Sequence, residues 1–180
     1  MPTLTYLTTL LLLSLSPTPA QSQSQAQALT VNLTYALYKS TFSPSTNLNV
    51  WKGIRYAAPP IGPLRWQKPA PPLVNLTQVV VANTPAPICP QAMPAIQGMP
   101  FVQGDEDCLF LSVWSGWRGA EGEKLLPVVV VIHGGGYGAG DGSQDMSGFL
   151  ATNGNGVVTV VVQYRVSFFL FLSREVGVVW

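Results

Sequence analysis

The sequence carries very little charge. Asp, Glu, Lys and Arg make up only 9% of its 180 residues, and the formal net charge is +1, whereas soluble domains carry roughly 25% charged residues. No cluster of Lys and Arg occurs anywhere along the chain, which excludes a nucleic-acid binder that works through a basic patch. Two cysteines and a remote histidine make no metal-ligand set. We therefore expect no nucleic-acid partner and no metal.

A long apolar stretch that could cross a membrane is also missing. Residues 1–20 contain no charged side chain, centre on four leucines and end in Thr-Pro-Ala, which is typical of a cleavable signal peptide and too short for a bilayer span. The later apolar run at 157–172 is interrupted by Gln163-Tyr164-Arg165. We expect a secreted protein with no membrane span, in which residues 21–30 form a low-complexity Ser/Gln/Ala leader and residues 31–180 form the domain.

Cysteine is scarce as well, since Cys89 and Cys108 are the only two. In an oxidising compartment such a pair forms a disulfide, which closes a loop and contributes roughly 3 kcal/mol on the chain-entropy view. Two free buried thiols remain the alternative reading of the residues alone.

Two tripeptides match the acceptor pattern for N-glycosylation. They begin at Asn32 and Asn75, each followed by Leu and Thr. The pattern places an acceptor asparagine on the surface of a secreted protein. We therefore expect glycans on Asn32 and Asn75.

Hydrophobic periodicity in the first half of the chain predicts strands separated by loop. Apolar residues alternate with polar ones over 31–38, which is the pattern of a half-buried strand. A second strand is expected over 50–56 and a short one over 109–114. Prolines recur so densely between 57 and 100 that we expect an ordered loop there. A polar turn is expected at 118–124.

The second half of the chain predicts one α/β crossover. Residues 127–132 are apolar at every position, as in a parallel strand buried on both faces. A helix is expected over 144–152, ended by Asn-Gly-Asn-Gly, and a further apolar strand over 157–162. Strand, helix and parallel strand in this order predict an α/β fold.

A glycine-rich loop, HGGGYGAG at 133–140, follows the first of these apolar strands. Gly134, Gly136 and Ala139 formally fit the dinucleotide pattern G-x-G-x-x-[GA], but the acid expected after the next strand is missing and no lysine follows for a phosphate loop. We therefore expect no cofactor. The other chemistry served by such a loop is an oxyanion hole, in which backbone N–H groups stabilise a developing negative charge.

Several segments, in family order, resemble the type-B carboxylesterase/lipase family, the cholinesterase-like α/β-hydrolases. EDCLFLSVW at 106–114 resembles the family signature E-D-C-L-x-L-N-[IV]-[WY]. GIRYAAPP at 53–60 and PLRW at 63–66 resemble its G-I-P-Y-A-x-P-P and L-R-F segments. HGGGY at 133–137 resembles its oxyanion loop, and the Tyr-Arg at 164–165 resembles the Y-R that follows. The likeness runs from residue 31 to about residue 175.

The resemblance implies a fold, an activity and site residues. The fold would be a truncated α/β-hydrolase, with N-terminal antiparallel strands and the first crossover of the central sheet. The activity would be serine-type hydrolysis of a small-molecule carboxylic ester, without cofactor. Gly135 and Gly136 would donate to the oxyanion, and His133 would open the loop rather than act as the base. The implied structural pairs are the disulfide Cys89–Cys108 and a buried ion pair, Arg65–Glu106.

The sequence also departs from the family pattern. No G-x-S-x-G occurs among the 180 residues, and Ser167 and Leu170 stand where the family has glycines. We therefore expect this chain to carry the oxyanion loop but no catalytic nucleophile, acid or base, and to be inactive alone. A non-catalytic secreted esterase-like binding protein and a non-functional truncated product are the alternatives. The sequence does not indicate substrate, acyl-chain length or oligomeric state.

Overall fold

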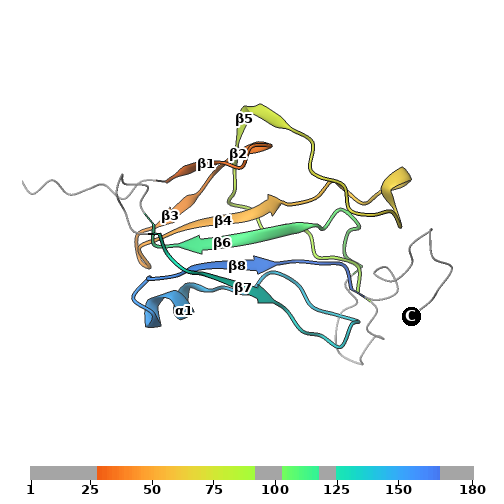
Figure 1. The fold of residues 1–180 in the computed structure, drawn as a ribbon. Coiled ribbons are helices and arrows are strands. Elements are labelled where there is room, and N and C mark those ends of the chain that lie inside the picture. The colour runs from red at the N-terminus through yellow and green to blue at the C-terminus, as the bar shows by residue number, and fades with distance from the viewer. Residues whose placement is uncertain (1–27, 92–102, 118–124, 167–180) are drawn as a thin grey trace, which may run out of the picture.

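The computed structural model describes residues 28–91, 103–117 and 125–166 (Figure 1). The expected signal peptide, most of the leader and the expected polar turn lie outside these residues. The described strands form a five-stranded sheet in the order β3-β4-β6-β8-β7 and a three-stranded sheet in the order β1-β2-β5. The elements are β1 Thr30–Asn32, β2 Ala36–Lys39, β3 Thr41–Ser43, β4 Leu48–Arg55, β5 Asn75–Val81, β6 Phe110–Ser115, β7 Val128–Ile132, α1 Ser147–Thr152, β8 Val158–Val162 and the short 3-10 helix Gly62–Leu64.

The larger sheet contains the expected crossover. β7 and β8 pair in parallel, in register from Val128↔Val158 to Ile132↔Val162, and α1 lies between them in sequence. β4 and β6 precede them as antiparallel strands. An antiparallel lead followed by a parallel strand–helix–strand unit is the α/β architecture that the sequence predicts.

The two faces of the larger sheet are covered by different elements. Cross-strand partners share a face and sequence neighbours do not, so Trp114 lies on the face of its partner Thr159, and Val113 lies on the other. On the Trp114 face, Leu150 of α1 packs against Val161 in a core that also contains Leu48 and Met146. On the opposite face, Trp51 and Ile54 of β4 pack against Ala36 and Tyr38 of the smaller sheet.

The strand predicted over 31–38 is wrong in one respect, because the chain reverses within it. β1 and β2 pair antiparallel, with Val31 opposite Tyr38, and the N–H of Leu33 donates to the carbonyl of Ala36 at 3.0 Å. Thr34 takes a φ of 70° at the turn. The alternation of apolar and polar residues continues without a break from one arm of this tight hairpin into the other. Periodicity therefore could not reveal that the chain reverses.

The proline-rich segment 57–100 is not loop throughout. It includes β5, which pairs in parallel with β2 from Leu37↔Val79 to Lys39↔Val81. All residues of β5 are exposed. Its sequence therefore lacks the alternation of apolar and polar residues by which a half-buried strand is recognised. The flanking prolines at 71, 72 and 85 lie outside the strand and do not interrupt its hydrogen bonds. The sequence also did not predict β3, which forms a hairpin with β4.

Two further expectations need correction. The helix is shorter than 144–152: α1 begins at Ser147, after the carboxylate of Asp145 has accepted hydrogen bonds from the Ser147 N–H and hydroxyl. β7 is not buried on both faces, because Val128, Val130 and Ile132 are 60%, 56% and 71% exposed. Within the described residues, β7 is an edge strand of the larger sheet, and no element covers the face that carries these three side chains. No helix in the described part of the chain is long and apolar enough to cross a membrane.

Candidate functional site

The glycine loop leaves β7 at His133, and Tyr164 holds its entry. The two rings stack, with centroids 4.2 Å apart and planes 14° from parallel. The Tyr164 hydroxyl also donates to the His133 carbonyl. His133 comes directly after β7, and Tyr164 comes two residues after the end of β8. Because β7 and β8 are parallel and in register, their ends lie side by side, which brings His133 and Tyr164 together. His133, the only histidine in the sequence, therefore opens the loop as expected.

The middle of the loop is a tight turn that needs glycine. Gly135 has a φ of 137°, and a Cβ there would lie 1.9 Å from the Ala139 carbonyl oxygen. That close approach lets the Gly135 carbonyl accept hydrogen bonds from the N–H groups of Gly138 and Ala139, at 3.2 and 3.1 Å. Gly136 has a φ of 59°, again in the region that favours glycine.

Two adjacent donors remain available at this turn. Gly135 and Gly136 are both exposed. Among the residues that the structure describes, no acceptor is bonded to either backbone N–H. Adjacent unpaired N–H groups in a glycine turn form a concave site for a negatively charged oxygen.

The exit of the loop is held by two glutamine side chains. The Gln91 amide brackets Gly140: its Oε1 accepts the Gly140 N–H at 2.7 Å and its Nε2 donates to the Gly140 carbonyl at 3.2 Å. Gln163, only 4% exposed, accepts the Gly142 N–H at 3.4 Å. The loop is thus fixed at both ends and open in the middle.

Sequence reasoning missed both glutamines. The sequence distinguishes Gln163 only as an interruption of the apolar run at 157–172 and as a residue at the position where the dinucleotide-binding acid is missing, and it does not distinguish Gln91. A polar amide directly after an apolar strand was the one available signal, since such a group must find partners when it is buried. Gln163 does so, donating to the carbonyls of Pro87 and Cys108.

The predicted disulfide is confirmed. The sulfurs of Cys89 and Cys108 are 2.04 Å apart and both residues are fully buried. The bridge joins the segment that follows β5 to the segment that leads into β6. Both glutamines that hold the loop also bond to it, through the Cys89 carbonyl at 2.7 Å from Gln91 Nε2 and the Cys108 carbonyl at 2.9 Å from Gln163 Nε2.

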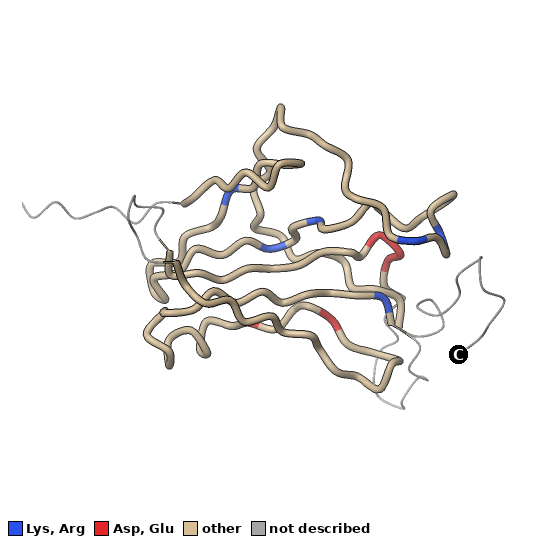
Figure 2. The backbone as a smooth tube through the Cα atoms, in the orientation of Figure 1, with Lys and Arg blue, Asp and Glu red and all other residues tan. Residues whose placement is uncertain are grey.

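The predicted ion pair forms, but it is not buried. Arg65 Nη2 lies 2.6 Å from Glu106 Oε1, with side chains 45% and 32% exposed. The burial that the family resemblance implied is therefore wrong, because both side chains remain partly open to solvent. A second pair, which the sequence did not predict, joins Arg55 to Asp107 with side chains 24% and 30% exposed. In Figure 2 positive and negative positions adjoin at this end of the sheet.

Comparison with known proteins decides the family. The model of the carboxylesterase family matches residues 37–179. The chain belongs to the carboxylesterase family.

Relatives of this carboxylesterase chain are much longer than the chain itself. It is 41% identical over 124 residues to juvenile hormone esterase of Tribolium castaneum, covering 68% of this chain and 20% of the relative. It is 35% identical over 146 residues to para-nitrobenzyl esterase of Bacillus subtilis, covering 79% of this chain and 28% of the relative. The match thus spans between 20% and 28% of the length of these two relatives.

Solved esterase structures share the fold. Aspergillus niger EstA superposes with a TM-score of 0.68 at 31% identity, over 81% of this chain and 27% of that one. A PNB esterase structure superposes with a TM-score of 0.63 at 36% identity, over 82% and 28%. The described part of this carboxylesterase chain therefore has the α/β-hydrolase fold.

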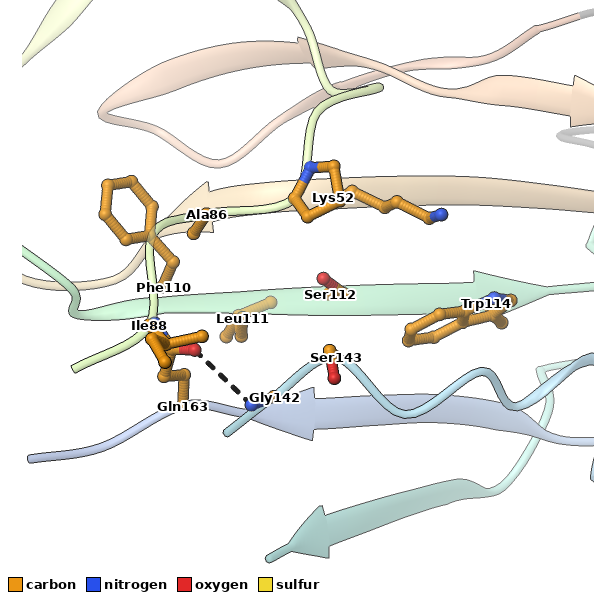
Figure 3. A pocket seen from close by; sticks show the side chains of 11 residues that line it. Lys52, Ala86, Ile88, Phe110, Leu111, Ser112, Trp114, Gly142, Ser143 and Gln163 are labelled. Carbon is orange, nitrogen blue, oxygen red and sulfur yellow. Dashed lines mark hydrogen bonds between the residues drawn. The ribbon is translucent and has the colours of Figure 1, made fainter. Parts of the chain in front are cut away.

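A small cavity lies beside the loop exit on the Trp114 face (Figure 3). Its volume is about 60 Å³, and Ser112 and Ser143 line it together with Gln163 and Gly142. The N–H of Gly142 points to the side chain of Gln163 across this cavity. Within the described residues, neither serine hydroxyl is hydrogen-bonded to His133. The cavity therefore lacks the serine–histidine pair that nucleophilic catalysis needs.

Both predicted glycan acceptors are exposed. Asn32 ends β1, where its Oδ1 accepts the Thr34 N–H at 2.8 Å. Asn75 begins β5, where its Oδ1 accepts from the Thr77 N–H and hydroxyl, at 3.1 and 2.8 Å. Glycosylation at either position stays a prediction. No group of three or more potential metal ligands occurs in the described ranges.

Proposed function

We propose that this chain supplies the oxyanion-binding part of a secreted carboxylic ester hydrolase of the serine type, acting on a small-molecule ester. The observation that carries the proposal is the pair of exposed N–H groups at Gly135 and Gly136, which bond to no acceptor among the described residues and lie on a loop fixed at both ends. Family membership supports the reaction class. The apolar segment at 1–20 and the sequons at Asn32 and Asn75 support secretion.

The chemistry follows from charge development. When a serine oxygen attacks the carbonyl carbon of an ester, the carbonyl oxygen becomes negatively charged in the tetrahedral intermediate. Backbone N–H groups that are already aimed at that oxygen stabilise the charge without reorganising, and each such donor contributes a factor of about 10²–10³ in kcat. Gly135 and Gly136 would be two such donors. A glycine at each position leaves no side chain between donor and substrate.

The nucleophile must come from elsewhere. The 180 residues contain no G-x-S-x-G, so the loop polarises a carbonyl that nothing in the described site attacks. We expect the purified chain to hydrolyse no p-nitrophenyl ester and to take up no organophosphate probe. Turnover together with stoichiometric labelling of a serine would contradict this expectation.

The ester class follows from several relatives together rather than from one. Their names include juvenile hormone esterase, fumonisin B1 esterase and cocaine esterase, the last from Homo sapiens. Carboxylic esters of very different shape thus occur across the family, and the shared chemistry is the oxyanion. We therefore propose the ester class and no single substrate.

A chimera tests the oxyanion role. The matched segment of Bacillus subtilis para-nitrobenzyl esterase is replaced by this chain's segment, and hydrolysis of a p-nitrobenzyl ester is measured. Gly135→Ala should lower kcat by about 10²–10³-fold, because a Cβ there would meet the Ala139 carbonyl at 1.9 Å and turn the donors away. Gly134→Ala is the matched control, since its Cβ would meet nothing within 4 Å. Equal effects of the two substitutions would overturn the proposal, and a folded but inactive chimera would favour a non-catalytic binding protein.

A further inference from the structure

The disulfide and the glycine loop are connected by side chains whose role neither the family comparison nor the oxyanion proposal assigns. Gln91 Nε2 donates both to the Cys89 carbonyl, at 2.7 Å, and to the Gly140 carbonyl, at 3.2 Å. Gln163 Nε2 donates to the Cys108 carbonyl at 2.9 Å while its Oε1 accepts from Gly142. Each cysteine of the bridge is thus joined to the loop exit by one amide side chain.

We propose that Gln91 and Gln163 are positioning residues. Their side chains hydrogen-bond the exit of the glycine loop to the two backbone segments that the Cys89–Cys108 disulfide joins. The disulfide thereby sets the geometry of the donors at Gly135 and Gly136. This inference rests on the proposed oxyanion role for its catalytic consequence, and its structural half stands on the hydrogen bonds alone.

The surroundings of Gln163 explain why it can act in this way. Gln163 is 4% exposed, and its backbone is held on both sides, by its N–H to the Phe110 carbonyl at 3.0 Å and by the Tyr56 hydroxyl on its carbonyl at 2.8 Å. A buried amide with all these partners has one orientation, because leaving any of its polar groups unpaired costs about 1–3 kcal/mol. The disulfide segment is equally fixed, since both cysteines are fully buried.

The loop itself supplies little rigidity. It is rich in glycine, and its internal contacts include the bonds from Gly138 and Ala139 to the Gly135 carbonyl and the contact of His133 Nδ1 with the Gly134 carbonyl. Glycine loses the most conformational freedom on ordering. External anchors must therefore define the turn, and Gln91 at Gly140 is the anchor closest to it along the chain on the exit side.

Amide hydrogen exchange in the purified 180-residue chain tests the structural half. The reporters are the N–H groups of Gly138 and Ala139, which neither glutamine touches but which are protected only while the Gly135 turn is closed. Gln91→Met and Gln163→Met keep side-chain length and remove the amide. Each should speed exchange at both reporters about tenfold, the effect of losing one or two net hydrogen bonds from the closed state.

Ser40→Ala is the matched control. It removes two hydrogen bonds away from the loop, a part-buried one that Ser40 accepts from the Leu29 N–H and a buried one that it donates to the Asn49 side chain. It should leave the two reporters unchanged. If it speeds them as much as the glutamine substitutions do, or if the glutamine substitutions affect only Gly140 and Gly142, the positioning role is wrong.

The disulfide arm uses the double substitution Cys89→Ser with Cys108→Ser. It should speed the same reporters, and adding Gln91→Met should increase the rate little further, because the two changes remove the same support. Full additivity would contradict the coupling. In the chimera, Gln91→Met should lower kcat with KM nearly unchanged, since the donors act in the transition state. Faster loop exchange with unchanged kcat would overturn the catalytic consequence, and Gly135→Ala then shows whether the oxyanion proposal itself fails.

Discussion

Arg55 and Asp107 form a two-point ion pair in which Nη1 lies 2.6 Å from Oδ1 and Nη2 lies 2.8 Å from Oδ2. The guanidinium also lies over the Phe110 ring, 4.4 Å from its centroid. The hydrogen bonds that Arg55 donates to the Asp107 carboxylate raise the pKa of Arg55 above its already high usual value. The pair joins the end of β4 to the segment that carries Cys108. Arg55 stands where the G-I-P-Y-A-x-P-P motif of the family has proline.

The first prediction compares this pair with the more exposed one. Arg55→Met should lower the free energy of unfolding by about 1–2 kcal/mol, because the Arg55–Asp107 pair is a planar two-point pair and its arginine is less exposed than Arg65. Arg65→Met should cost about 0.5 kcal/mol, as typical for an exposed pair. Urea unfolding followed by tryptophan fluorescence measures both, and a double-mutant cycle with Asp107→Asn isolates the pair energy. Equal losses for the two arginines would contradict the ranking.

The second prediction concerns Thr159 at the centre of the larger sheet. It is fully buried, and within the described residues its Oγ1 has no hydrogen-bond partner. Thr159→Val keeps the shape and removes an unpaired hydroxyl, so it should stabilise the protein by about 1 kcal/mol. Thr159→Ser, which keeps the hydroxyl and removes a methyl group, is the control and should destabilise. A lower melting temperature for the valine variant would show that the hydroxyl is satisfied.

The third prediction concerns pH and the start of α1. The N–H and hydroxyl of Ser147 donate to Asp145, and these bonds lower its pKa below the ordinary 3.8. A depressed carboxyl pKa adds stability above the unfolded value, and that stability is lost as the pH falls through the folded value. Asp145→Ala should therefore destabilise at pH 7, and the difference from the parent chain should shrink below pH 3.8.

Asp145→Asn separates the effect of the charge from that of the hydrogen bonds with Ser147 in the same experiment. Asparagine keeps an acceptor for Ser147 but does not titrate. Its unfolding midpoint should stay close to that of the parent at neutral pH and lack the acid-dependent decline. A difference between parent and alanine variant that persists unchanged at pH 2 would contradict the role of the charge.

The fourth prediction concerns the edge of β7. Val130 is 56% exposed on an all-apolar strand that has no neighbour on its outer side in the described ranges. Open apolar edges pair with other chains, and a lysine on the edge blocks that pairing. Val130→Lys should reduce the fraction of large species in sedimentation velocity runs. Leu73→Lys, which adds the same charge at an 85% exposed site outside the strands, should change it little, and an equal improvement would mean that net charge alone is responsible.

The fifth prediction concerns secretion. Chain expressed in a secreting eukaryotic cell should begin at Gln21 and lose mass on enzymatic deglycosylation, because Asn32 and Asn75 are exposed acceptors. Thr34→Val and Thr77→Val should each abolish modification at their own site, whereas Thr41→Val, outside any sequon, should not. Intact-mass measurement checks all three, and retention of Met1 would contradict the signal peptide.

Local pattern was enough to predict several parts of this protein. The apolar runs that became β7 and β8 and the glycine loop between strand and helix are visible as consecutive residues. The family-like segments identified the carboxylesterase family, and the pairing of Cys89 with Cys108 followed from there being only two cysteines in a chain read as secreted. Each of these depends on residue types at short spacing, and a sequence displays those directly.

Only the tertiary structure decided what depends on contacts between distant segments. The reversal at Thr34 and the parallel pairing of β5 with β2 leave no periodic signal, because both arms share one alternation and β5 is exposed throughout. The Arg55–Asp107 pair spans 52 positions and the Gln91–Gly140 bracket 49. Which residues become partners depends on how the strand ends are arranged in space and on the requirement that buried polar groups form hydrogen bonds. The order of residues along the chain reveals neither the arrangement nor the partners.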